Sequence, residues 1–148
     1  MLKKTIIILI VIFVAIQFIR IDKTNPVVDE KLTLKAPKEV GSILQKGCYD
    51  CHSNETKWPY YSNIAPISFF VGTHVKKGRK ALNFSIYNQI KDDIKVQRLK
   101  RAIFMVKTER MALPSYVSAH EEAKLSKDEK NILINWFKDE LASLGESN

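Results

Sequence analysis

The stretch "GCYDCHSNETKWPYYSNIAP", residues 47–66, decides the fold of this chain, because it holds both cysteines and one of the three histidines. Two residues separate Cys48 from Cys51, and His52 follows directly. Four uses of this pattern compete. They are covalent haem attachment, a redox dithiol, a zinc site, and a structural disulfide beside an idle histidine.

Cys-x-x-Cys-His is the spacing at which haem c is attached. Two thiols must reach two vinyl groups on one edge of the porphyrin, and the next residue must direct an imidazole at the iron. A two-residue spacer wound as a helical turn meets both needs. The motif therefore predicts one covalently attached haem c, with Cys48 and Cys51 as the thioether residues and His52 as the proximal iron ligand.

The other three readings fit the sequence less well. A redox dithiol of the thioredoxin type follows a strand and opens a helix within a βαβ unit, and no strand pattern precedes Cys48. Zinc needs four ligands, and beyond the motif only His74 and His120 are available, at unrelated spacing. A structural disulfide leaves His52 without a role.

The N-terminus carries an apolar run, "TIIILIVIFVAIQFI" at Thr5–Ile19, which follows Lys3 and Lys4. Fifteen helical residues rise about 22 Å, short of the ~30 Å hydrocarbon core of a bilayer, and snorkelling lysines would cover the difference. No small-x-small cleavage site follows the run. We therefore predict an uncleaved transmembrane anchor over residues 1–21, with the rest of the chain in the periplasm or outside the cell.

Export bears on the cysteines and on the charge. Thiols outside the cytoplasm do not stay free, so both cysteines are expected to be oxidised or used. The 24 basic and 16 acidic residues give a formal charge of +8, or +5 when the three basic residues flanking the apolar run are set aside. The basic residues are scattered, which predicts a solvated surface and no nucleic-acid partner.

The rest of the chain divides into a tether at 22–37, with two prolines, and a haem-binding domain at 38–148. Helices are expected over 38–46, from Ile67 to Gly78, over 90–106, and after a capping box at Ser126–Glu129. No run alternates with period two, so the fold class is predicted as all-α: a compact, cytochrome c-like helical domain around one haem. Such a small core suits a large apolar ligand at its centre.

The sixth iron ligand is less constrained. Met111 lies in a proline-containing loop and is the favoured distal ligand, with His74 as the alternative and His120 as a weaker one. Met105 lies within an apolar helix, which favours a core role. Side chains proposed more weakly to bind the haem propionates are Arg79, Lys80 and Trp58. The aromatic stretch after the motif is expected to form one wall of the pocket.

Four segments together carry a family resemblance. These are "GCYDCHSNETKWPYYSNIAPIS", "HVKKGRKALNFS", "MALPSY" and "HEEAKLSKDEKNILINWF". They resemble the small haem-binding domain family of bacterial c-type cytochromes, from about Val40 to about Leu141. The resemblance implies a single covalent haem in a compact helical domain, often tethered to a membrane. The family's methionine segment usually reads Met-Pro-Leu-Pro, and here Ala112 replaces the first proline.

These observations predict a membrane-tethered monohaem cytochrome c that carries single electrons, rather than a catalyst. Its expected partners are redox proteins of a respiratory chain or a peroxidase. The alternative is a peroxidase-associated module or a haem-based ligand sensor. Both alternatives require an open or displaceable sixth position on the iron.

Overall fold

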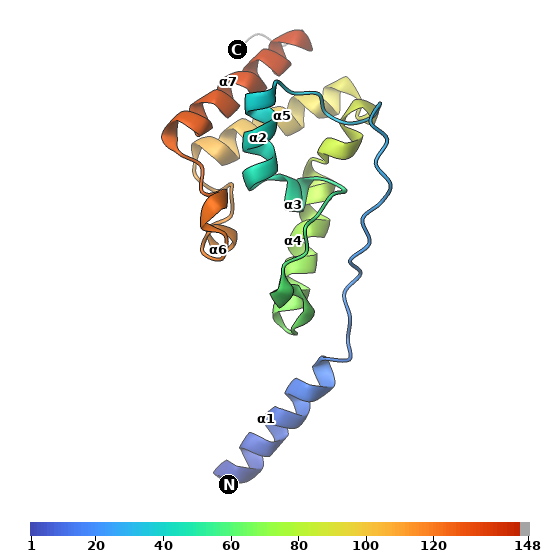
Figure 1. Cartoon of the computed structure of the whole chain (residues 1–148), viewed down its shortest axis with the longest axis vertical. Helices are drawn as coiled ribbons and strands as arrows, with labels where there is room; N and C mark the ends of the chain where they lie inside the picture. Colours follow the sequence, from blue (N-terminus) through green and yellow to red (C-terminus); the bar gives the residue numbers. More distant parts are fainter. Residues whose placement is uncertain (146–148) are drawn as a thin grey trace.

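The computed structural model describes residues 1–145, and all of the regular structure in that range is helical (Figure 1). The all-α prediction is confirmed. The elements are α1 (Leu2–Ile16), α2 (Lys38–Gly47), α3 (Tyr49–His52), η1 (Tyr60–Asn63), α4 (Ile67–Ala81), η2 (Phe84–Gln89), α5 (Asp92–Lys107), α6 (Pro114–Val117), η3 (Glu121–Ala123) and α7 (Lys127–Ser143).

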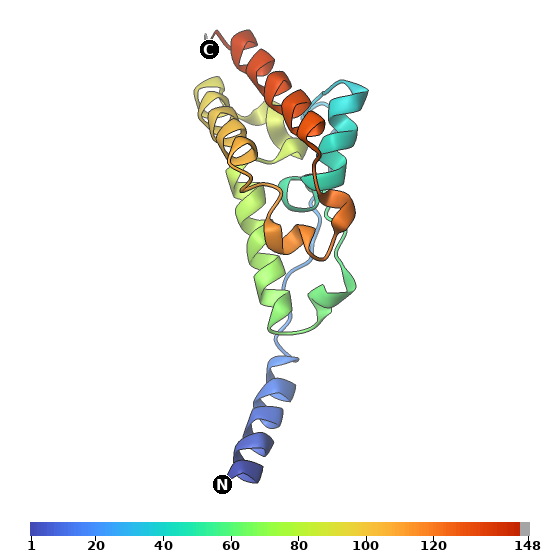
Figure 2. The same cartoon turned by 90° about the vertical axis from the view of Figure 1, so that its left-hand side faces the viewer.

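The hydrophobic core lies where α5 and α7 pack together and α2 lies against α7 (Figures 1 and 2). Apolar residues spaced three and four apart place one face of each helix in this core. The most buried members are Leu44, Leu99 and Leu133, each with 1% or less of its surface exposed. The capping box that opens α7 is present, because Ser126 Oγ accepts from Glu129 N and Glu129 returns a carboxylate oxygen to Ser126 N.

The helix α4 extends away from the core and carries α3 on its C-terminal half (Figure 2). The sequence predicted that this helix ends at Gly78, but it continues to Ala81. Gly78 instead allows two backbones to meet: a Cβ on Gly78 would lie 2.3 Å from the carbonyl oxygen of Cys51. The glycine therefore sets how closely α4 approaches the cysteine motif.

The N-terminal helix α1 projects from the opposite end of the molecule, with its aliphatic side chains exposed (Figure 1). It covers 15 residues, and no helix within residues 1–145 is long and apolar enough to cross a membrane. The predicted transmembrane helix is therefore not supported. The apolar run predicted a helix to Ile19, whereas α1 ends at Ile16 and the side chain of Gln17 turns to the backbone of Ala65.

The stretch between α1 and α2 is extended and runs along the helical domain. Arg79 donates to the carbonyl of Thr24 and to Oδ1 of Asn25. Further along, Leu34 N donates to the carbonyl of Phe84 at 2.8 Å. Residues 22–37 are thus bonded at several points to α4 and to the segment that follows it.

Candidate functional site

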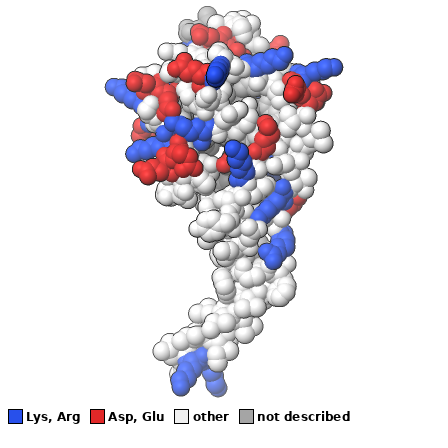
Figure 3. Space-filling model, viewed as in Figure 1, with Lys and Arg blue, Asp and Glu red and all other residues white. Residues whose placement is uncertain are grey.

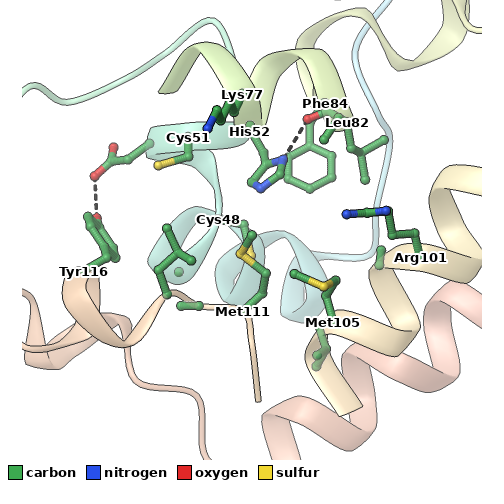
Figure 4. A pocket seen from close by; sticks show the side chains of 18 of the residues that line it. Cys48, Cys51, His52, Lys77, Leu82, Phe84, Arg101, Met105, Met111 and Tyr116 are labelled. Carbon is green, nitrogen blue, oxygen red and sulfur yellow. Dashed lines mark hydrogen bonds between the residues drawn. The ribbon is translucent and has the colours of Figure 1, made fainter. Parts of the chain in front are cut away.

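A cavity of about 280 Å³ lies between the cysteine motif, α4, α5 and the loop that precedes α6 (Figure 4). Its walls are largely apolar. The lining residues that the argument below uses are Cys48, Cys51, His52, His74, Lys77, Arg98, Arg101, Met105, Met111 and Tyr116.

The motif is wound into a single helical turn by local backbone bonds. The amides of Cys51 and His52 both donate to the carbonyl of Cys48, at 3.1 and 2.9 Å. The helix α2 ends at Gly47, and the non-helical backbone of Cys48 (φ −129°) offsets the motif from it. This turn brings both cysteines and His52 to the same cavity.

Both cysteines are free thiols, and burial strongly disfavours their ionisation. Desolvation, together with the neighbouring Cys51, raises the pKa of Cys48 to about 12. Desolvation and the charge of Asp50 raise the pKa of Cys51 to about 11, although Arg79 opposes this shift. Redox-active and nucleophilic cysteines have lowered pKa values, so these thiols do not match a thioredoxin-like dithiol.

One nitrogen of His52 is held by the backbone and the other faces the cavity. His52 Nδ1 lies 2.8 Å from the carbonyl oxygen of Leu82. A carbonyl only accepts, so Nδ1 carries the proton and Nε2 keeps its lone pair. In Figure 4, Nε2 is directed toward the side of the cavity that holds Met105 and Met111. Burial lowers the pKa of His52, which favours the neutral imidazole that binds metals.

Two methionines lie across the cavity from His52 (Figure 4). Met111 follows the end of α5, and its amide donates to the carbonyl of Met105 at 3.1 Å. Met105 was predicted to be a core residue, yet its thioether shares the cavity wall with that of Met111. The helical periodicity of α5 does not distinguish a core face from a cavity face, because both are apolar.

The two other histidines occupy different places. His74 lines the cavity from α4, with Nδ1 2.9 Å from the carbonyl of Phe70 in its own helix. His120 is not among the cavity-lining residues. Its Nε2 pairs with the Tyr61 hydroxyl at 2.8 Å, and its Nδ1 pairs with the Glu122 carboxylate at 3.1 Å.

The cations at this cavity are Lys77 from α4 and Arg98 and Arg101 from α5. None of the three was predicted from the sequence, where they appear as ordinary basic residues of amphipathic helices. Arg79, which the sequence suggested, instead donates to the Ser53 carbonyl and to the stretch before α2. Helical spacing from Lys77 was the signal that could have separated these two residues, since positions two apart point in different directions.

The helix α6 is fastened to the motif by Tyr116. Its hydroxyl donates to Asp50 Oδ2 at 2.6 Å, and desolvation and the Asp50 carboxylate raise the pKa of Tyr116. The ring of Tyr116 also stacks on His120, with ring centroids 4.4 Å apart. This bond holds the loop that carries Met111 against the motif. The sequence placed Tyr116 in a recognisable segment but assigned it no contact.

The aromatic stretch after the motif does not line this cavity, contrary to the prediction. Pro59, Tyr60 and Tyr61 line a second cavity of about 410 Å³ on the other side of Cys51. The backbone explains the difference. The loop after His52 turns away, because Thr56 Oγ1 donates to the carbonyl of Asp50 and Lys57 N to its carboxylate.

Zinc finds no ligand set here. Within residues 1–145, no group of three or more histidine, cysteine, aspartate or glutamate side chains is placed to hold a metal ion. An apolar cavity with one directed imidazole, two thiols and two thioethers matches instead the ligands that proteins use for haem.

The fold and the cavity define a small all-helical domain that binds a large apolar cofactor. The chain belongs to the haem-binding domain family, whose family model matches residues 11–139. Haem is therefore the cofactor. Comparisons with curated proteins and with solved structures find no match.

The residues present fit this cofactor. His52 offers a lone pair on a fixed ring, and Cys48 and Cys51 lie within one turn of it on the same cavity. Lys77, Arg98 and Arg101 supply positive charge suited to haem carboxylates.

Proposed function

We propose that this protein is a monohaem c-type cytochrome that carries single electrons on the outer side of the cytoplasmic membrane. The observation that carries the proposal is the placement of two thiols and a directed imidazole on one apolar cavity. In this proposal Cys48 and Cys51 hold one haem through thioethers, His52 is the proximal ligand, and Met111 is the distal ligand.

The bound haem would supply an iron that changes between two oxidation states one electron apart. The protein's own contribution is to fix and shield it. The bond from His52 Nδ1 to the Leu82 carbonyl orients the imidazole and increases the basicity of Nε2. Leu133 and Phe137 exclude water from the cavity, and a thioether ligand favours a higher potential than a second imidazole.

The proposal places the protein at a membrane through α1. This helix exposes an aliphatic surface behind Lys3 and Lys4, and it resembles the charged and apolar regions of an export signal. Without a helix that spans the bilayer, we propose attachment to the membrane surface. The redox partners would be proteins of a respiratory chain or a peroxidase, with Lys77, Arg98 and Arg101 favouring acidic contacts.

The test uses the full chain produced with the cytochrome maturation machinery. We expect a low-spin, six-coordinate spectrum in both oxidation states, a reversible one-electron titration, and no change in the ferrous spectrum under carbon monoxide. A five-coordinate ferrous form that binds carbon monoxide rapidly would contradict electron transfer. That result would support a peroxidase-associated module or a ligand sensor.

A further inference from the structure

Four large apolar side chains are exposed at the end of the domain nearest α1. Tyr60 and Ile64 follow the turn of η1, and Ile67 and Phe70 lie in the first turn of α4. Their exposed fractions are 81%, 43%, 47% and 56%. We call these four residues the tip. A cluster of this kind at one end of a small domain marks an interaction surface.

The tip is bonded directly to the end of α1. The side-chain amide of Gln17 donates to the Ala65 carbonyl and accepts from its amide, both at 3.0 Å. Arg20 and Lys23 donate to the Asn63 carbonyl and to Asn63 Oδ1, at 3.3 and 2.6 Å. Any surface that receives the apolar helix α1 is therefore brought to the tip as well.

The charge around the tip has one predominant sign. Residues 56–75 contain one charged side chain, Lys57, and the chain carries no acidic residue from 56 to 91. Arg20 and Lys23 add positive charge beside Asn63. In Figure 3, the acidic side chains gather over the part of the domain away from α1, while the lower end is mostly uncharged.

Exposed aromatic and aliphatic side chains beside lysine and arginine are the composition of a protein surface that meets lipid head groups. We propose that the tip is a second membrane-contacting surface, which lies in the head-group region of a bilayer containing anionic lipid. The proposal rests on the membrane attachment of α1 proposed above and extends it. The haem domain is then held in a fixed orientation instead of hanging from a flexible tether.

This orientation sets the position of the cofactor. The helix α4 begins at the tip, and Gly78 at the cofactor cavity lies 11 residues beyond Ile67. At 1.5 Å per residue, the cavity is about 16 Å along the helix axis from the tip. Docking by the tip would leave the cavity mouth above the membrane, where a soluble redox partner reaches it.

The experiment titrates the full-length holoprotein with vesicles of phosphatidylcholine and phosphatidylglycerol, and measures the bound fraction by flotation. The tip variant carries Tyr60→Ser, Ile64→Ser and Ile67→Ser, none of which lines the haem cavity. The matched control carries Ile94→Ser and Phe104→Ser, which remove exposed apolar side chains from α5 at the far end. The haem absorption spectrum of each variant verifies that it is folded.

We expect the tip variant to need at least fivefold more lipid for half-maximal binding, and the control to match the wild type. We also expect vesicles of phosphatidylcholine alone to bind the wild type more weakly. Equal binding of all three proteins would overturn the role of the tip while leaving the attachment of α1 intact. A wild type that does not float would overturn membrane attachment itself.

A further outcome would identify a different occupant of the tip. If sedimentation in detergent shows a wild-type dimer that the tip variant loses, while vesicle binding is unchanged, the tip contacts a second copy of the chain. That result would also overturn the proposal.

Discussion

At the scale of single residues, Gly78 decides how the cysteine motif packs. A Cβ at this position would lie 2.3 Å from the Cys51 carbonyl oxygen, which belongs to backbone and cannot move aside cheaply. We expect Gly78→Ala to lower the free energy of unfolding by about 1–3 kcal/mol, as overpacking does. Urea denaturation followed by circular dichroism measures this change.

Gly41 provides a matched control within a helix. Nothing lies within 4 Å of a Cβ at Gly41 in α2, so Gly41→Ala should raise the free energy of unfolding by about 0.5–1 kcal/mol. If Gly78→Ala is as stable as the wild type, the close approach of α4 to Cys51 is wrong.

The distal ligand is a choice between two methionine sulfurs that share the cavity. We expect Met111→Ala to remove the long-wavelength absorption band of methionine-ligated ferric haem and to let carbon monoxide bind the ferrous form. Met105→Ala should keep the band, since only a neighbouring contact is lost. The opposite pair of results would make Met105 the distal ligand.

At the scale of elements, α6 and the motif are connected by one buried contact. Tyr116→Phe removes the hydrogen bond to the Asp50 carboxylate without changing the shape of the ring. Hydrogen bonds to charged groups contribute about 1.5–3 kcal/mol, so we expect a loss of roughly that size in the free energy of unfolding.

A double-mutant cycle with Asp50→Asn isolates this contact. The two single variants and the double variant are compared by urea denaturation. Additive effects of Tyr116→Phe and Asp50→Asn would show that the two side chains do not interact.

The contact between α2 and α7 should depend on pH. Hydrogen bonds from Lys46 and from Ser126 N, with the charge of Lys46, hold the pKa of Glu129 below its ordinary value of 4.5. A lowered pKa in the folded state contributes stability above the unfolded value, and this is lost as the pH falls through the folded value. Thermal melts of wild type and Glu129→Gln should differ at pH 7 and converge in acid.

Glutamine is the matched replacement here, because it still accepts the Ser126 amide in the capping box. Lys46→Met should remove the same pH dependence from the other side of the pair. A constant difference between wild type and Glu129→Gln from pH 7 to pH 3 would contradict the assignment.

The helices were predictable where a periodic face meets the core, and least predictable where a residue contacts a distant segment. The capping box at Ser126 and the apolar positions of α7 are local patterns, so the start of α7 was correct. Gly78 reads as a helix end by composition, yet it serves the contact with Cys51, which lies 27 residues earlier. Only the folded chain shows that contact.

The candidate site divides in the same way. His52 follows from local spacing, but the carbonyl that orients its ring belongs to Leu82, 30 residues away. The cations Lys77, Arg98 and Arg101 meet at the cavity only because α4 and α5 border it together. The aromatic stretch was misplaced because hydrogen bonds to Asp50 turn it toward the second cavity.

At the scale of the whole molecule, one polarity organises the chain. The apolar helix α1 and the tip lie at one end, and the hydrophobic core with most acidic side chains lies at the other (Figures 1 and 3). The cofactor cavity lies along α4, between the two ends. This arrangement suits a carrier that is fixed to a surface and exchanges electrons with partners above it.

Covalent attachment of haem at Cys48 and Cys51 is the central claim, and the mass of the intact, denatured protein tests it most directly. The chain is produced with the cytochrome maturation machinery, unfolded in acid and treated with an alkylating reagent before mass spectrometry. We predict the mass of the chain plus one haem, with neither cysteine alkylated. A chain without haem that takes up two alkyl groups would contradict the account.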